Sequence, residues 1–407
     1  MSSRRNRQDS VSSQQVYGLA TAVLEKSLRW TDKGYKCTVR NILLVLLTAA
    51  SRLSSIHDAC LRLKNGPCDQ SVYDTLAVLL PADCAALERR LNRALDVKLP
   101  RSLLKKARPA AVDYFDVNYY GRCHRRKREL CGGKRRDGTD TFHRYATLCV
   151  LRRGQRFTLA MTYVYKGDSH ARVVKRLLRR ARARGLKIRY LLLDRGFYGL
   201  DVVKLLQSMH CPFVIPVVHR GRRPRRTTDL SRLKGTRRFL TWRKAGFSHH
   251  VMDNRKSKAR VGIAVAFAWK TTRSGRRRKR RGKPMVFAFW GLKPASPAWV
   301  KTTYRSRYGI ETSYRQLHQA RARTASRKPN LRLLLVGLAL ILRNLWAWVH
   351  HQLLGRVRGK ALELRLDRLR FRTMLLMLQR CAESLLGCSE RPPNPLSLIR
   401  LAADPAP

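Results

Sequence analysis

The spacing of hydrophobic positions changes at Pro100, which separates two kinds of sequence. Before it, the apolar segment 41–53, with Thr38 as its N-cap, predicts a buried helix. Two short helical segments follow around a turn at residues 65–67, which is typical either of a helix-turn-helix or of an ordinary helical bundle. Residues 1–16 are polar and lack an apolar core, so we expect a disordered tail and no signal peptide.

After Pro100 the pattern predicts an α/β unit around a mixed sheet. Strand-like segments come first, and strands then alternate with helices. Asp168 or Ser169 can cap the first of these helices, and Gly185 ends it. We expect strands at residues 110–117, 142–151, 156–165, 187–193 and 213–218, a turn at residues 153–155, and helices at residues 171–184 and 200–209.

Residues 219–284 interrupt this alternation. They contain arginine-rich runs at residues 220–226 and 276–281, next to strand-like segments, and so predict a β-rich insertion with strongly charged loops. A strand at residues 285–290 follows, and then a helix from about Thr303 that must stop before Pro329.

The last part of the chain predicts further helices. Arg332 and Arg343 bracket about ten apolar residues, which is too short a run to span a bilayer and indicates a buried helix. After Gly359, an amphipathic and basic segment predicts another helix, which serves either dimerisation or DNA contact.

The charge of the chain indicates its partner. Lysine and arginine outnumber acidic residues by 88 to 25, which gives a formal net charge of +63. Such a chain repels itself unless a polyanion neutralises it, and DNA and RNA are the abundant cellular polyanions. A membrane surface usually needs only a local basic cluster, whereas the basic residues here run from Arg4 to Arg400. We therefore expect nucleic acid as the partner and no membrane.

The ten cysteines do not predict a metal site. There is no C-x-x-C pair, and the one ligand-like group, Cys123, His124 and Cys131, lacks a matching second half. We expect reduced thiols in a cytosolic protein and no structural zinc.

Two aspartates occupy positions that need a reason in so basic a chain. Asp113 lies in the apolar run AAVDYFDV, and Asp194 ends the apolar run RYLLLD. Carboxylates at the ends of neighbouring buried strands lie together at the rim of a sheet, where they repel one another unless a cation intervenes. Mg²⁺ accepts a few carboxylates and keeps positions for phosphate oxygens. The alternative is that Asp194, which precedes Arg195 and Gly196, is only a turn or cap residue.

A third carboxylate, Glu311, lies in the helical pattern YRSRYGIETSYRQLH. At helical spacing, Tyr304, Arg307, Glu311 and His318 share one stripe. Glu311 could then hold metal while Arg307 binds phosphate. The alternative is a surface pair of Arg307 and Glu311, four residues apart, of little energetic weight.

At these residues the sequence resembles the DDE transposases of prokaryotic insertion sequences, in particular the "insertion sequence four" superfamily. The signature of that group is Tyr, two residues, Arg, three residues, Glu, six residues, Lys. Tyr304, Arg307 and Glu311 match it, and His318 stands in the place of the lysine. LLLDRGFYG resembles the segment of the second aspartate, and AVDYFDVNYYG that of the first, where Asp113 is our assignment and Asp116 the alternative. The resemblance covers roughly residues 105–345.

The resemblance implies a ribonuclease-H-like catalytic core that binds two Mg²⁺ or Mn²⁺ ions through Asp113, Asp194 and Glu311. It also implies cleavage and strand transfer at the terminal inverted repeats of a mobile element. Because two element ends must be joined, we expect a homodimer on double-stranded DNA, in the cytoplasm and associated with the nucleoid. On this interpretation residues 17–104 form a helical DNA-binding region, residues 105–218 and 285–355 the catalytic core, residues 219–284 the insertion, and residues 356–407 a C-terminal helical region and tail.

Several residues are candidates for DNA contact. Histidine is charged only below about pH 6.5, so the phosphate contact at His318 is weaker than that of a lysine, or is made by Arg315 or Arg321. The remaining candidates for the DNA backbone are Tyr304, which we expect to position other groups, Arg307 and Arg195. Trp242, Trp269 and Trp290 either stack on a flipped base or belong to the core of their strands.

Two other functions compete with transposition. A structure-specific nuclease of the same fold shares all three carboxylates but does not transfer strands. A non-catalytic DNA-binding protein derived from a transposase keeps the basic surface and tolerates the loss of a carboxylate. A basic RNA-binding protein is a weaker alternative, because it gives the two strand-end aspartates no purpose.

Overall fold

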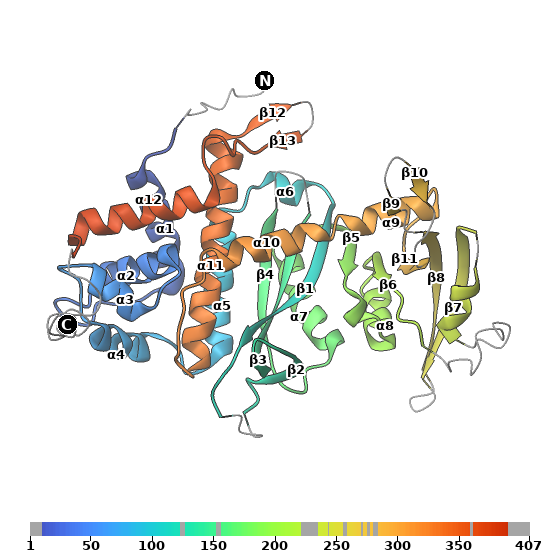
Figure 1. Cartoon of the computed structure of the whole chain (residues 1–407), viewed down its shortest axis with the longest axis horizontal. Helices are drawn as coiled ribbons and strands as arrows, with labels where there is room; N and C mark the ends of the chain where they lie inside the picture. Colours follow the sequence, from blue (N-terminus) through green and yellow to red (C-terminus); the bar gives the residue numbers. More distant parts are fainter. Residues whose placement is uncertain are drawn as a thin grey trace, which may run out of the picture. The chain divides into compact units, whose positions relative to one another are not determined.

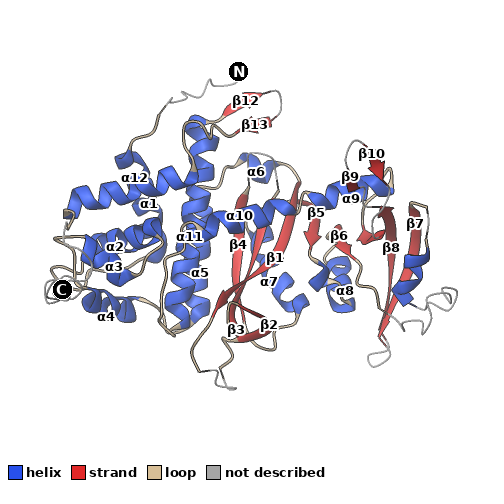
Figure 2. Ribbon diagram, viewed as in Figure 1, coloured by secondary structure: helices blue, strands red, loops and turns tan. Residues whose placement is uncertain are grey.

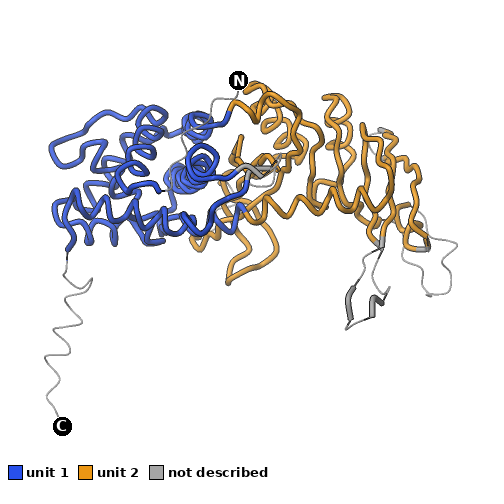
Figure 3. Tube along the Cα trace, turned by 90° about the horizontal axis from the view of Figure 1, so that it is seen from above, with its two compact units in different colours: residues 1–100, 153–155, 313–407 blue, residues 101–152, 156–312 orange. Residues whose placement is uncertain are grey.

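The computed structural model has two compact units (Figure 3). Unit 1 contains residues 1–100, 153–155 and 313–407, and unit 2 contains residues 101–152 and 156–312. The structure describes residues 10–122, 127–151, 156–220, 235–242, 244–254, 259–269, 272–274, 277–279, 284–358 and 361–389. These units differ from the division expected from the sequence, which assigned residues 285–355 to the catalytic core. In the structure, residues 313–355 group with the N-terminal helices rather than with the strands.

Unit 1 is a bundle of helices (Figure 1). Its central helix, α11, is buried almost throughout, and at Gly337 it approaches α5 so closely that a Cβ atom would lie 2.6 Å from the side chain of Leu91. α12 packs its apolar face against α2 and α1. The helices are α1 (Ser13–Leu28), α2 (Val39–Arg52), α3 (Ile56–Arg62), α4 (Asp69–Leu79), α5 (Cys84–Val97), α11 (Pro329–Val349) and α12 (Phe371–Leu386).

The ends of this bundle differ from the sequence-based prediction in two places. The polar N-terminal segment is shorter than expected, because Ser12 and Gln15 form a capping box that starts α1 at Ser13. The C-terminal helix starts at Phe371 rather than soon after Gly359, since the strands β12 (Arg356–Arg358) and β13 (Ala361–Glu363) come first. The apolar face of α12 packs against other helices of the same chain.

One helix among the described residues, Pro329–Leu354, is long and apolar enough to cross a membrane. α2 and α3 pass the same test only if they are taken together as one bent span. In the most apolar window of Pro329–Leu354, 94% of the residues are buried inside the structure. Core helices pass this test too, so the finding is weak evidence for a span.

Unit 2 is built on a mixed nine-stranded sheet (Figure 2). β1 is central to its first half: it pairs with β3 in antiparallel and with β5 in parallel orientation, and β6 runs parallel to β5. β2 and β4 pair with β3. These strands are β1 (Arg108–Asn118), β2 (Cys131–Arg136), β3 (Thr139–Val150), β4 (Phe157–Val164), β5 (Ile188–Leu193) and β6 (Phe213–Pro216).

Two helices connect the parallel strands. α7 (His170–Ala183) joins β4 to β5, and α8 (Leu200–Ser208) joins β5 to β6. Ser169, rather than Asp168, caps α7 by accepting a hydrogen bond from the amide of Arg172, while Asp168 pairs with Arg176. The predicted alternation of strands and helices is therefore confirmed in this half of the unit.

The predicted insertion adds to the same sheet. β11 (Pro284–Trp290) pairs with β6, β8 (Ala259–Trp269) pairs with β11, and β7 (Gly246–Asn254) pairs with β8, all antiparallel. A short hairpin joins β9 (Thr272–Ser274) to β10 (Arg277–Lys279). Several sequence-based expectations fall outside the described residues: most of the first arginine-rich run (residues 221–226), half of the second (residues 276 and 280–281), the turn at residues 153–155, and Cys123 with His124.

The helix predicted from about Thr303 is in fact two helices. α9 (Pro297–Arg305) begins at the N-cap Ser296, and α10 (Tyr308–His318) begins three residues after α9 ends. Ser306 and Arg307 form the turn between them, in which the Arg307 amide donates to the carbonyl of Tyr304. Arg307 therefore lies at a break rather than within a continuous helical face.

Candidate active site

The sheet brings the two strand-end aspartates side by side. β1 and β5 are parallel neighbours whose register ends with Val112 opposite Leu193, one residue before Asp113 and Asp194. Asp113 lies within β1 and is largely buried, whereas Asp194 follows the last residue of β5 and is about half exposed. The prediction that two neighbouring strands carry these carboxylates is confirmed.

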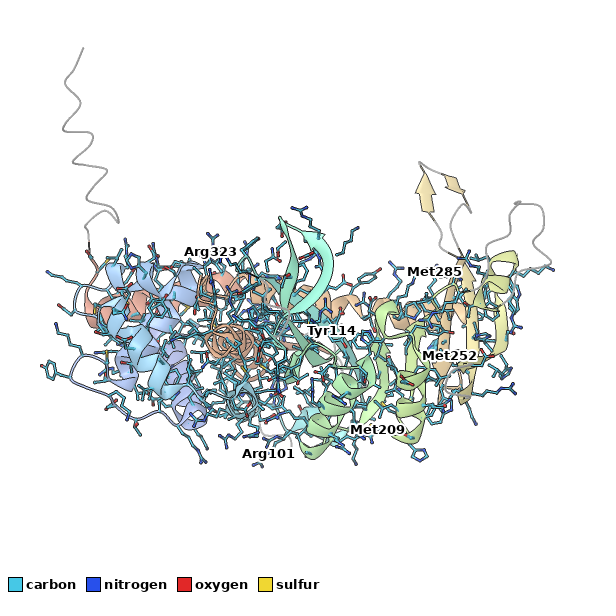
Figure 4. The ribbon with its side chains drawn as sticks, turned by 90° about the horizontal axis from the view of Figure 1, so that it is seen from below. Arg101, Tyr114, Met209, Met252, Met285 and Arg323 are labelled. Carbon is cyan, nitrogen blue, oxygen red and sulfur yellow. The ribbon has the colours of Figure 1, made fainter. Side chains whose placement is uncertain are left out.

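An aromatic cluster holds the turn that follows Asp194. Asp194 stands at the N-cap position of a single 3₁₀ turn, Arg195–Phe197, but its side chain makes no capping hydrogen bond. The ring of Phe197 stacks on that of Tyr114, with 4.7 Å between centroids, and the Tyr114 hydroxyl hydrogen-bonds His170 Nδ1 at 2.9 Å. Figure 4 labels Tyr114 on β1. The sequence-based prediction missed this cluster, although an aromatic residue close to each aspartate was a signal that could have indicated it.

Gly309 lets the first turn of α10 lie close to the end of β3. A Cβ atom at this position would lie 3.0 Å from both the Leu151 side chain and Arg156 Nε. That spacing is tighter than most contacts of real Cβ atoms, so with a larger residue the side chains of Leu151 and Arg156, or the turn itself, must shift by a few tenths of an ångström. Since Glu311 lies two residues further on, Gly309 helps to set where its carboxylate stands.

The guanidinium of Arg307 lies among all three predicted carboxylates. Its Nη1 is 2.8 Å from Asp113 Oδ2, and its Nη2 is 2.6 Å from Glu311 Oε1. The same Nη2 is 3.6 Å from Asp194 Oδ1. Arg307 is 8% exposed, so it is no part of a loose surface pair. Residues 113, 194 and 311, which are far apart in the sequence, thus meet around one cation.

The carboxylates perturb one another through burial and repulsion. Burial raises the pKa of Asp113 to about 6, the Arg307 guanidinium opposes this rise, and Asp194 adds to it. The Tyr114 amide also donates to Asp113 Oδ1 at 2.8 Å and so favours the ionised form. Ionisation of the Asp113 carboxyl is therefore costly in the metal-free protein.

Asp116, the alternative first carboxylate, belongs to a different set of contacts. Its Oδ1 accepts from Arg144 Nε at 2.7 Å, and its Oδ2 accepts from Arg136 at 2.9 Å. Residues three apart on a strand face opposite sides of the sheet. The geometry therefore favours Asp113 over Asp116 as the partner of Asp194 and Glu311.

The other residues of the signature differ in exposure. Tyr304 is 7% exposed and packs its ring 5.1 Å from that of Phe287, and burial raises its pKa. Arg195 is exposed, beside Asp194. Arg315 and His318 lie four and seven residues after Glu311 on α10, and both are exposed. Partial desolvation and then the charge of Arg321 lower the pKa of His318, so it is neutral at physiological pH.

The three tryptophans that the sequence offered for base stacking have different surroundings. The half-buried Trp242 packs against Phe239 and Phe267, with centroids 5.6 and 5.7 Å away, as expected of a core residue. Trp290 is half-buried at the end of β11, opposite Phe213. Trp269 is the last residue of β8, and its side chain lies outside the described part.

The chemistry of the donor set fits a divalent cation. In the part of the chain that the structure describes, no three His, Cys, Asp or Glu residues are arranged as ligands around one point. However, carboxylate oxygens of three acidic residues lie within 3.6 Å of the terminal nitrogens of a single guanidinium. Carboxylates are the protein ligands that Mg²⁺ and Mn²⁺ prefer, and a cation already stands between them.

Comparison with known families agrees with this geometry. The profile described as transposase DDE domain matches residues 108–345, which is more than half of the chain and includes all three carboxylates. The chain belongs to the DDE transposase family. DDE transposases are enzymes that act on DNA and generally use divalent metal ions. No curated protein matches the chain.

Proposed function

We propose that this DDE transposase is of the "insertion sequence four" type and that it cuts and joins DNA at the ends of a mobile element. One observation carries the proposal: Asp113, Asp194 and Glu311 meet around a single cationic group, at the rim of a sheet, within the region that matches the family. The spacing of Tyr304, Arg307 and Glu311 supports the assignment to this type.

The order of the strands supports a ribonuclease-H-like core. The strands follow one another across the sheet in the order β4, β3, β1, β5, β6. β3 is antiparallel to β1, whereas β1, β5 and β6 are parallel to one another. α7 and α8 are the connections that bring the chain to the parallel strands. In this arrangement the first aspartate lies on the central strand and the second at the end of its parallel neighbour.

In the proposed mechanism Asp113, Asp194 and Glu311 would hold two Mg²⁺ or Mn²⁺ ions. When bound, these ions would supply activation of the attacking water or DNA 3′-hydroxyl and stabilisation of the leaving oxygen. Asp113 must lose its proton for this role, and the surrounding positive charge favours the loss. The buried Tyr304 supports Arg307, whose guanidinium lies 5.6 Å above its ring.

The remaining contacts of the proposal concern DNA. Arg195, which follows Asp194, and Arg315, four residues after Glu311, are both exposed. Together with Arg307 they are candidates for phosphate contact. A neutral His318 contributes a hydrogen bond there rather than a charge. We further propose that Trp269 or Trp290 stacks on a base, that the N-terminal helices bind DNA, and that the enzyme is a homodimer on the nucleoid.

The test is DNA cleavage by the full chain and by Glu311→Gln. The substrate is labelled duplex DNA taken from the sequences that flank the gene, and the reaction contains Mg²⁺ or Mn²⁺. Glutamine keeps the shape of the side chain and removes its charge, so we expect cleavage to fall by at least about a hundredfold while DNA binding persists. Equal cleavage by both proteins would show that the carboxylates are misassigned.

Strand transfer separates the two enzymatic candidates. If the wild type cuts and also joins the labelled 3′ ends to a target plasmid, the transposase proposal stands. Cleavage without any joined product favours a nuclease of the same fold, and DNA binding without cleavage in either metal favours a non-catalytic DNA-binding protein.

A further inference from the structure

Arg307 occupies the position that a cation between the carboxylates needs. The oxygens that accept its hydrogen bonds, Asp113 Oδ2 and Glu311 Oε1, face inward toward the guanidinium, and Asp194 Oδ1 lies 3.6 Å from it. Mg²⁺ requires its oxygen ligands at about 2.0–2.1 Å, which leaves no room for a guanidinium between the same atoms. Two positive groups would also repel one another in this largely buried space.

We infer that Arg307 is an exchangeable occupant of the cation site, which neutralises the carboxylates until a divalent ion replaces it and then binds a DNA phosphate. The inference rests on the proposed function, because it takes the three carboxylates to be metal ligands. The guanidinium of Arg307 has the planar fork that matches phosphate oxygens. The exchange moves one positive charge from the carboxylates to the substrate.

The surroundings of Arg307 suit such an exchange. It lies in the turn between α9 and α10, where its amide donates to the carbonyl of Tyr304 and its carbonyl accepts from the amide of Ile310. The backbone can therefore stay in place while the long side chain changes rotamer. Its carboxylate contacts come from three separate segments, and within the described residues its Nε is buried without a hydrogen-bond partner. The rings of Tyr304 and the exposed Tyr308 lie 5.6 and 5.9 Å from the guanidinium carbon and can guide its path.

The exchange makes metal and DNA binding cooperative. DNA that holds Arg307 removes the competitor of the metal, and metal that displaces Arg307 frees it for the phosphate. By linkage, each ligand must raise the affinity for the other by the same factor. The enzyme would then hold its metal ions most tightly when DNA is in place.

The test is calorimetric titration of Mn²⁺ into the full metal-free chain, in the absence of DNA. Arg307→Gln removes the competing charge, so we expect it to bind Mn²⁺ about tenfold or more tightly than the wild type. Arg307→Lys keeps the charge but cannot bridge three carboxylates, so its affinity should lie between the two. A purely structural role predicts the opposite direction, because loss of packing weakens the site.

Arg176→Gln is the matched control. Arg176 pairs with both oxygens of the buried Asp168, at 2.7 and 3.3 Å, in the same unit but outside the site. We expect this variant to bind Mn²⁺ like the wild type. Unchanged or weaker Mn²⁺ binding by both Arg307→Gln and Arg307→Lys would overturn the inference. If Arg307→Gln does not fold, the Mn²⁺ affinity of Arg307→Lys alone decides, because the exchange requires it to exceed that of the wild type.

Two further titrations separate this inference from the proposed function. With saturating duplex DNA, the wild type should gain Mn²⁺ affinity, and Arg307→Gln should gain markedly less. If Glu311→Gln abolishes Mn²⁺ binding but Arg307→Gln binds Mn²⁺ no more tightly than the wild type in the absence of DNA, the exchange is overturned and the metal site stands. If Glu311→Gln binds Mn²⁺ as the wild type does, the proposed function itself fails.

Discussion

Asp113 and Asp116 show why single residues of this site could be proposed but not chosen from the sequence. Both are aspartates in one apolar run, and both have arginine partners. Asp116 pairs with arginines of β2 and β3, which lie within 30 positions of it in the sequence. The arginine partner of Asp113 lies 194 positions away. Only the fold brings that arginine to β1, so the local pattern leaves the choice open.

The raised pKa of Asp113 predicts how stability depends on pH. Folding raises its pKa from an ordinary value near 3.8 to about 6, so the folded protein holds this proton more tightly than the unfolded one. Between these two pH values the stability contributed by Asp113 is lost as pH rises. Relative to Asp113→Asn, the metal-free wild type should lose roughly 2–3 kcal/mol of unfolding free energy between about pH 4 and pH 7. Urea denaturation of both proteins across this range measures the difference.

Two comparisons make that measurement specific. Saturating Mn²⁺ favours the ionised carboxylate, so it should remove most of the loss in the wild type. Asp116→Asn breaks a buried ion pair instead, and should lower stability by about 3 kcal/mol near neutral pH while leaving Mn²⁺ binding unchanged. If the difference in unfolding free energy between the wild type and Asp113→Asn stays constant with pH, the pKa of Asp113 is not raised on folding.

At the scale of elements, the regular segments of unit 2 could be predicted well. The strands at residues 142–151 and 187–193 and the helices on either side of Asp194 all occur close to their predicted bounds, because a buried face imposes a clear hydrophobic period. The break between α9 and α10 was missed. Tyr304, Arg307, Glu311 and His318 keep helical spacing across it, and the turn depends on packing rather than on a proline or a glycine within it.

Gly309 offers a test of how precisely α10 must be placed. We expect Gly309→Ala to push the first turn of α10 away from Leu151 and Arg156, and so to shift Glu311. A small displacement of a catalytic group costs much activity, so DNA cleavage should fall by roughly tenfold, with DNA affinity unchanged. Stability should fall by about 1 kcal/mol, although alanine is the better helix former.

Gly18 in α1 provides the control, since a Cβ atom there meets nothing within 4 Å. Gly18→Ala should raise stability by up to about 1 kcal/mol and leave cleavage unchanged. If Gly309→Ala behaves in the same way, the close approach of α10 to β3 does not determine where Glu311 lies.

At the scale of the molecule, composition indicated the partner class, whereas the grouping of the helices depends on contacts that composition does not encode. The sequence placed residues 285–355 with the catalytic core, because the resemblance to the transposase family extends to about residue 345. The structure groups α11 with the N-terminal helices, since its apolar surface on all sides needs several helices to cover it. Which helices cover it depends on contacts between distant segments, such as Gly337 with Leu91, that hydrophobic periodicity does not encode.

The net charge of +63 predicts the salt dependence of DNA binding by the whole chain. Each phosphate that a lysine or arginine neutralises releases counterions, and the exposed basic residues are numerous on elements such as α7. We expect affinity for a random duplex to fall by about a thousandfold or more between about 50 and 200 mM salt. Fluorescence anisotropy of a labelled duplex without metal measures the slope, and Glu311→Gln should share it, because a carboxylate contacts no phosphate. A nearly flat salt dependence would mean that the positive charge serves some partner other than the DNA backbone.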